Sequence, residues 1–308
     1  LPYGFSRWAI RQVNEEAKRP AIIYFHPWEI DPDQPRVAGA PLRSRLRHYS
    51  NLSVMADKLR RLTRDFAWTR VAALADDLAA ATRLIRARHP GLPLFVVGES
   101  MGAAVILSAV AAKAPPNADG YVLSAPAVWA RHTMPVYQRA ALWVGAHAAP
   151  WLRLTGRGLN IRASDNDEML RRLGRDPLVI KGARIDALYG LTNLMDAAHA
   201  AAPSLNAPAL ILYGDGEQLI PAPVREAFLA RLPPDGHWRY AEYPTGFHML
   251  MRDLNAHVVL KDIAAWISDS SAELPSGADR AKGAQRWARG PCPPSREPAR
   301  TQQLALAC

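Results

Sequence analysis

Residues 93–114, "PLFVVGESMGAAVILSAVAAKA", constrain the fold more than any other part of the chain. A short apolar run leads into a serine between two glycines, and an apolar helical pattern follows at once. A strand joined to a helix by so tight a turn is typical of a parallel sheet covered by helices, with Ser100 at the edge of the sheet. Such a turn strains the serine backbone, so side chains in place of Gly98 or Gly102 are expected to collide with the neighbouring strand and helix. The pattern predicts Ser100 as a nucleophile; the alternative is an ordinary serine in a glycine-rich loop.

The region from 71 to 270 alternates between helical and strand patterns. Apolar residues recur at steps of three and four from Val71 to Ile85, as on one face of a helix, and "HPG" ends that pattern. Alternation of this kind predicts an α/β fold with a mostly parallel sheet flanked by helices. The expected strands are residues 94–97, 120–126, 208–214 and 237–244, and further helices are expected at 105–114, 222–231 and 254–268.

One stretch, residues 127–205, interrupts this alternation. Its pattern is helical, and "SDND" at 164–167 fits a capping box at the start of a helix. We therefore predict an inserted helical cap between two strands.

The two ends of the chain differ from this middle region. Residues 1–70 contain a long Pro/Gly loop, an expected strand at 21–26, an expected helix at about 52–65 and a short strand candidate, "FAWTRV". Residues 271–308 are rich in Pro, Gly, Ser, Ala and Arg and show no periodicity, so they are predicted to be a disordered tail.

Charge and cysteine content exclude several classes of function. The formal net charge is +10, but the excess of Lys and Arg lies at the two ends, and no dense basic stripe with aromatics occurs, which argues against nucleic-acid binding. Cys292 and Cys308 both lie in the tail, so the core has neither a disulfide framework nor a zinc site, and a cytoplasmic location is expected. We also expect no metal and no signal peptide. No transmembrane segment is expected, because no apolar run is long enough to span a bilayer.

A nucleophilic Ser100 should be followed in the chain by an acid and then a histidine. His248, in "YPTGFHML", lies between the last expected strand and the last expected helix, which places it at the same edge of the sheet as Ser100. Two carboxylates, Asp215 and Glu217 in "GDGEQLIP", follow the strand at 208–214, and either could orient the imidazole. The residues alone leave this choice open.

Several of these segments, among them "GESMGAAVILSA", "LYGDGEQLIP" and "YPTGFHMLMRDL", resemble bacterial monoacylglycerol lipases, which are lysophospholipase-like α/β-hydrolases. The resemblance covers about residues 71–270 and implies an α/β-hydrolase domain. In that family the acid stands three residues after the loop glycine; this position is Glu217, three after Gly214, and Asp215 stays the alternative. The resemblance implies a serine carboxylester hydrolase that cleaves a monoacylglycerol or a similar small acyl ester with Ser100, Glu217 and His248 and without a cofactor. It also implies a cap that receives the acyl chain and makes transient contact with a membrane surface.

The first 70 residues resemble a different family. "YFHPWEIDPDQPR" is similar to the carboxyl-terminal end of a polysaccharide deacetylase of the type linked to exosortase loci. The metal-binding segments of such enzymes are missing, and His26 alone cannot support metal-assisted deacetylation. The chain is therefore interpreted as a fusion in which the first strands of the hydrolase sheet are atypical or missing.

This fusion bears on the oxyanion hole, which needs two backbone N–H groups. Met101 is expected to supply one, and Trp28 is the candidate for the second, because Pro27 has no N–H. The rival interpretation is a non-catalytic fusion or truncation product with an incomplete oxyanion hole. A weaker one is the remnant of a carbohydrate deacetylase.

Overall fold

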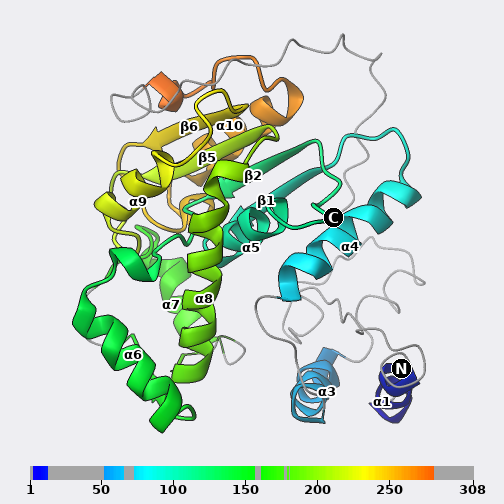
Figure 1. Ribbon diagram of the computed structural model, residues 1–308. Coiled ribbons are helices and arrows are strands. Elements are labelled where there is room, and N and C mark those ends of the chain that lie inside the picture. The colour runs from blue at the N-terminus through cyan, green and yellow to red at the C-terminus, as the bar shows by residue number, and fades with distance from the viewer. Residues whose placement is uncertain are drawn as a thin grey trace. The chain divides into compact units, whose positions relative to one another are not determined.

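The computed structural model describes residues 3–12, 52–65, 73–156, 161–176, 179 and 181–280 (Figure 1). The chain divides into two compact units, Leu1–Thr69 and Arg70–Cys308. The strands expected at 21–26 and in "FAWTRV", together with His26 and Trp28, lie outside the described residues.

The described part of the first unit consists of two helices, α1 (Tyr3–Arg11) and α3 (Leu52–Asp65). The Tyr3 hydroxyl donates a hydrogen bond to the Asp65 carboxylate, and the Arg61 guanidinium lies 4.0 Å from the centre of the Tyr3 ring. These contacts join α1 to α3. The helix expected at about 52–65 is confirmed.

The second unit is built on a parallel sheet, with strand order β1-β2-β5-β6 in the described residues. The strands are β1 (Phe95–Glu99), β2 (Gly120–Ser124), β5 (Ala209–Gly214) and β6 (Trp238–Tyr243). β2 and β5 are buried at every position, because each has a neighbouring strand on both sides and helices over both faces. This explains their continuous apolar sequences. The expected parallel sheet is confirmed, with strand ends that differ by one or two residues.

Helices cover both faces of this sheet (Figure 1). One face carries α5 (Met101–Val110), α8 (Ile185–Ala201) and α9 (Ala222–Leu229), with α4 (Ala73–Arg88) packed beside α5, and the other carries α10 (Ala256–Ser268). Ile211 and Tyr213 of β5 point to the first face, and Leu210 and Leu212 point to α10. Since successive side chains of a strand point to opposite faces, one apolar strand supplies both halves of the core.

The cap lies between β2 and β5. It contains α6 (Val136–Ala148), β3 (Arg153–Leu154), α7 (Asp167–Arg175), β4 (Ala183–Arg184) and α8. The helical pattern did not predict the antiparallel pair of β3 and β4. The capping box predicted at 164–167 is wrong, because Asn166 is the N-cap of α7 and accepts a hydrogen bond from the Met169 N–H at 3.1 Å.

The disorder predicted from residue 271 onward is wrong for residues 271–280. Leu274 and Ala278 are buried against the core beside β6 and α10, and residues Ala278–Arg280 form a short 3-10 helix, η6. The Ser276 N–H donates to Asp262, a fully buried carboxylate, at 3.0 Å. A buried carboxylate is unfavourable unless it accepts hydrogen bonds, so the donors of this polar segment stabilise its packing against α10. The rest of the predicted tail, residues 281–308, lies outside the described residues.

Within the described ranges, no helix combines the length and the apolar character needed to cross a bilayer. The same ranges hold no group of three or more His, Cys, Asp or Glu side chains arranged to bind a metal ion.

Candidate active site

Ser100 occupies the turn between β1 and α5 with backbone angles of φ 53° and ψ −112°. A positive φ is unfavourable for a residue with a side chain and persists only where the surroundings enforce it. Here the Ser100 N–H donates to the Ser124 carbonyl at 2.8 Å, and the Ser100 carbonyl accepts from the N–H of Ala127 at 3.1 Å. The end of β2 and the chain after it therefore hold the strained turn in place.

The two glycines beside Ser100 have different surroundings. A Cβ at Gly98 would lie 2.6 Å from Ile106 Cδ1 and 2.7 Å from the backbone N of Ala103, so no side chain fits there. A Cβ at Gly102 would meet no heavy atom within 4 Å among the described residues outside its own helix. The expected collision is found at Gly98, and among the described residues none is found at Gly102.

The acid–base pair comes from the loops after β5 and β6. His248 Nδ1 lies 2.7 Å from Glu217 Oε2, and the side chains of His248 and Glu217 are 6% and 0% exposed. The other carboxylate oxygen, Oε1, accepts from the N–H groups of Leu219 at 2.6 Å and Ile220 at 3.2 Å. Glu217 is therefore fixed by backbone donors, and its contact with Nδ1 leaves Nε2 of the imidazole for proton exchange. Asp215, the alternative acid, is an exposed residue of the same turn.

Two glycines allow the loops of the acid and the base to meet. A Cβ at Gly214 would lie 2.0 Å from the carbonyl oxygen of Gly246, and the Gly216 N–H donates to that same oxygen at 2.9 Å. The Asp215 N–H donates to the Tyr243 carbonyl at 3.1 Å. Backbone contacts thus join the acid turn (residues 215–220) to the base loop (residues 244–255).

Ser100, Glu217 and His248 all follow the carboxyl ends of parallel strands, where ligands bind in open α/β sheets. Glu99, the residue before Ser100, supports this proximity. Burial raises the pKa of its carboxyl, while the charges of Arg252 and His248 act in the opposite direction. His248 is therefore within electrostatic reach of the residue that precedes the serine.

Of the two predicted oxyanion donors, only one belongs to the described residues. Met101 is the first residue of α5, where backbone N–H groups have no acceptor within the helix. Trp28 lies outside the described residues.

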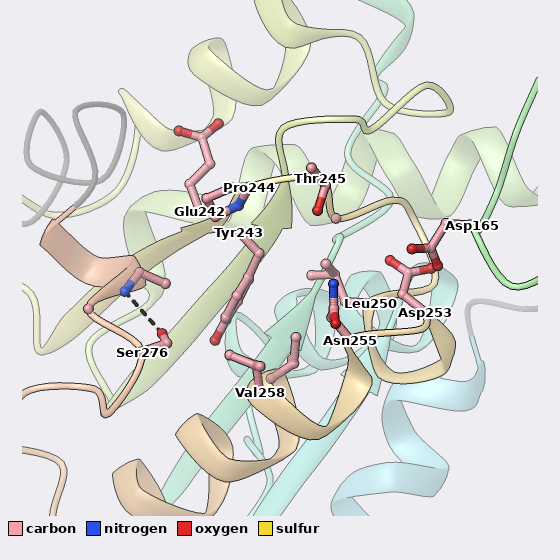
Figure 2. A pocket seen from close by; sticks show the side chains of 14 residues that line it. Asp165, Glu242, Tyr243, Pro244, Thr245, Leu250, Asp253, Asn255, Val258 and Ser276 are labelled. Atoms are coloured by element: carbon pink, nitrogen blue, oxygen red, sulfur yellow. Dashed lines mark hydrogen bonds between the residues drawn. The ribbon is translucent and has the colours of Figure 1, made fainter.

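A cavity of about 430 Å³ lies between the base loop, α10 and residues 276–278. Ser100, Glu217 and His248 do not line it. Figure 2 shows Asp165 and Asp253 close together at one end of this cavity, although Asp165 comes from the cap and Asp253 from the base loop. The cavity therefore marks a place where the cap meets the base loop.

Comparison with known protein families assigns the two parts of the chain differently. Residues 62–255 match the family described as serine aminopeptidase, S33, and residues 1–76 match DUF3473, a domain of unknown function. The second match is consistent with the deacetylase-like segment predicted at the amino terminus.

Relatives with assigned names are monoacylglycerol lipases. The chain is 32% identical over 187 residues to the monoacylglycerol lipase of Mycolicibacterium smegmatis, covering 58% of this chain and 63% of that protein. It is 28% identical over 195 residues to human monoglyceride lipase, covering 60% and 61% respectively. The predicted resemblance is confirmed, and the chain spans less than two thirds of the length of either relative.

Solved structures support the fold. The monoacylglycerol lipase of Paleococcus ferrophilus aligns with a TM-score of 0.54 at 21% identity, over 66% of this chain and 77% of that one. A soluble variant of monoglyceride lipase from Saccharomyces cerevisiae aligns with a TM-score of 0.54 at 20% identity, over 67% and 72%. The predicted α/β-hydrolase fold is confirmed.

Proposed function

This chain belongs to the serine aminopeptidase S33 family of α/β-hydrolases, and from that premise we propose that it is a serine carboxylester hydrolase. The observation that carries the proposal is the contact of 2.7 Å between the buried side chains of His248 and Glu217. Both residues follow strands of the same parallel sheet in which Ser100 follows β1. A buried carboxylate on Nδ1 is the arrangement that lets the opposite ring nitrogen act as a base.

In the proposed mechanism, Ser100 Oγ attacks the ester carbonyl carbon while His248 Nε2 accepts the hydroxyl proton. The tetrahedral oxyanion accepts a hydrogen bond from the Met101 N–H. His248 then gives the proton to the leaving alcohol, and the acyl group stays on Ser100. A water molecule, deprotonated by His248, attacks the acyl carbon; the bond to Ser100 Oγ then breaks, His248 returns the proton to Oγ, and the carboxylic acid is released. Glu217 orients the imidazole and stabilises its protonated form in both halves of the reaction.

We propose a monoacylglycerol or another small acyl ester as the substrate. The names of the relatives agree with this choice, and so does the cap, which has several large apolar side chains at its surface. These are Val136, Tyr137, Trp143, Val144, Trp151, Leu152, Leu154 and Ile161. Such a surface suits the acyl chain of an amphiphile and a transient contact with a membrane surface. A cytoplasmic location stays a prediction from the cysteine content.

The proposal is tested by the hydrolysis of p-nitrophenyl butyrate and of a monoacylglycerol by the native chain and by Ser100→Ala. We expect both esters to be cleaved by the native chain only. An aminoacyl p-nitroanilide is the third substrate, because the family description names an aminopeptidase. Cleavage of the anilide without either ester would overturn the esterase assignment. Folded native chain that cleaves none of the three would favour the non-catalytic alternative.

A further inference from the structure

One short part of the cap, residues 162–166, is joined to the base loop residue by residue. It lies between β3 and α7, and the residues of the base loop that its side chains bond come 86 to 89 positions later in the sequence. Four consecutive residues each make one hydrogen bond to that loop. The bonds are Met249 N–H to the Ala163 carbonyl at 2.9 Å, Ser164 Oγ to Asp253 Oδ1 at 2.6 Å, Leu254 N–H to Asp165 Oδ1 at 2.8 Å, and Asn166 Nδ2 to the Arg252 carbonyl at 3.1 Å.

One of these four bonds, and one further bond within the base loop, bear directly on the backbone beside His248. The Phe247 N–H, just before His248, donates to Asp253 Oδ2 at 2.8 Å. The Met249 N–H, just after His248, donates to the Ala163 carbonyl. With Glu217 on the imidazole, His248 is therefore held through its side chain and through the backbone N–H groups of the residues on both sides of it.

Asp253 links the base loop to the cap. Its side chain accepts Phe247 N–H on one oxygen and the Ser164 hydroxyl on the other, and Asp253 and Ser164 are 6% and 0% exposed. A buried carboxylate whose two oxygens are both bonded holds its donors in a fixed geometry, because releasing either donor would leave buried charge without a partner.

The same segment also reaches the acid turn. The Arg162 N–H donates to Gln218 Oε1 at 2.8 Å, one residue after Glu217, and the Arg162 guanidinium lies 5.5 Å from the centre of the Phe247 ring. Residues 162–166 thus contact both loops that carry the acid and the base.

We propose that Asp253 and Ser164 are positioning residues for His248, and that through them the 162–166 segment couples the cap to the acid–base pair. The inference rests on the proposed function, in which His248 is the base. Asp253 and Ser164 act on the backbone that carries the imidazole, so they set where Nε2 lies relative to Ser100. Loss of this support should slow the chemical step and leave substrate binding nearly unchanged.

The test compares Asp253→Asn, Ser164→Ala and the double variant with the native chain. Asn has nearly the shape of Asp, but an NH2 group replaces one of the two acceptor oxygens, so only one of the two bonds can keep its native donor and acceptor. Titration with a fluorophosphonate measures the concentration of active sites. Each rate is divided by this concentration, so that unfolded protein does not lower the measured kcat. We expect kcat per site to fall about tenfold to a hundredfold in Asp253→Asn, with KM within about twofold. Ser164→Ala should lower kcat per site by a smaller factor. The fold-decrease in the double variant should be less than the product of the two single fold-decreases, because the two residues share one hydrogen bond.

Glu168→Gln is the matched control. It also removes a carboxylate near the start of α7, but Glu168 is exposed and pairs with Arg172 on its own helix. Its kcat and KM should equal the native values. If Asp253→Asn and Ser164→Ala lower thermal stability but keep the native kcat per site, the two residues are merely structural and the inference is overturned.

A spectroscopic measurement separates this inference from the proposed function. The proton between His248 and Glu217 should give a downfield imidazole resonance in the proton NMR spectrum of Ser100→Ala, and Glu217→Gln in that background should abolish it. Adding Asp253→Asn should shift or broaden this resonance, and adding Glu168→Gln should not. An unchanged resonance in the Asp253→Asn spectrum contradicts positioning, whether or not the native chain hydrolyses esters. A shifted resonance in a chain without esterase activity supports the positioning role and rejects only the proposed function.

Discussion

His248 Nδ1 and Glu217 Oε2 lie 2.7 Å apart, with both side chains almost completely removed from solvent. Glutamate has a side chain one methylene longer than aspartate, the other carboxylate that can orient a histidine. The second oxygen of Glu217 accepts two backbone N–H groups, from Leu219 and Ile220. The acid turn therefore fixes the longer side chain, so that the extra methylene need not loosen the pair.

Replacing Glu217 by Gln should lower kcat by roughly a thousandfold or more, because an amide cannot stabilise the imidazolium and disturbs the tautomer that leaves Nε2 free to accept a proton. Asp215→Asn, in the same turn but exposed, is the matched control and should stay within about twofold of the native rate, as expected for a surface substitution. Steady-state hydrolysis of p-nitrophenyl butyrate measures both. The assignment is wrong if Asp215→Asn has the larger effect.

The glycines of the elbow should respond differently to alanine. Gly98→Ala forces a Cβ to within 2.7 Å of the backbone N of Ala103, so we expect a loss of several kcal/mol, on the order of 3 kcal/mol, or a displaced Ser100 without activity. Gly102→Ala has open space in the described structure and lies in the first turn of α5, so its stability should be unchanged or higher by up to about 1 kcal/mol. Chemical denaturation and ester hydrolysis report both quantities. Equal damage from the two substitutions would show that the elbow is packed differently.

His199 should make the fold sensitive to acid. It lies in α8 and is 3% exposed, and its pKa is lowered from 6.5 to about 4, first by burial and then by the nearby charges of His132 and Arg231. Between these two values the unfolded chain binds a proton that the folded chain does not, so the free energy of unfolding should fall as the pH drops from 6.5 towards 4.

The size of this loss is on the order of 1–3 kcal/mol, and His199→Leu should remove most of it. Denaturation at a series of pH values measures the slope. The exposed His257, changed to Gln, is the control and should keep the native slope. A His199→Leu variant with the full acid sensitivity of the native chain would place its origin elsewhere.

The sequence predicted those parts of the site that depend on local pattern. Apolar runs set the strands, and the order of Ser100, Glu217 and His248 after successive strands followed from the topology of a parallel sheet. The contact between Ser164 and Asp253 could not be predicted, because 89 residues separate the two and no spacing rule links a cap residue to a loop after the last strand. Leu274 was missed because one apolar residue in a polar segment has no periodicity, although it fills a gap beside α10. The open space at Gly102 likewise depends on packing in three dimensions.

The central claim is that Ser100 is an activated nucleophile. A fluorophosphonate probe reacts covalently with such a serine, and the modified peptide is identified by mass spectrometry after digestion. We predict a single labelled site at Ser100, labelling that is lost in Ser100→Ala, and labelling that is strongly slowed in His248→Gln. Folded native chain that remains unlabelled, or that is labelled equally in Ser100→Ala, would contradict the account.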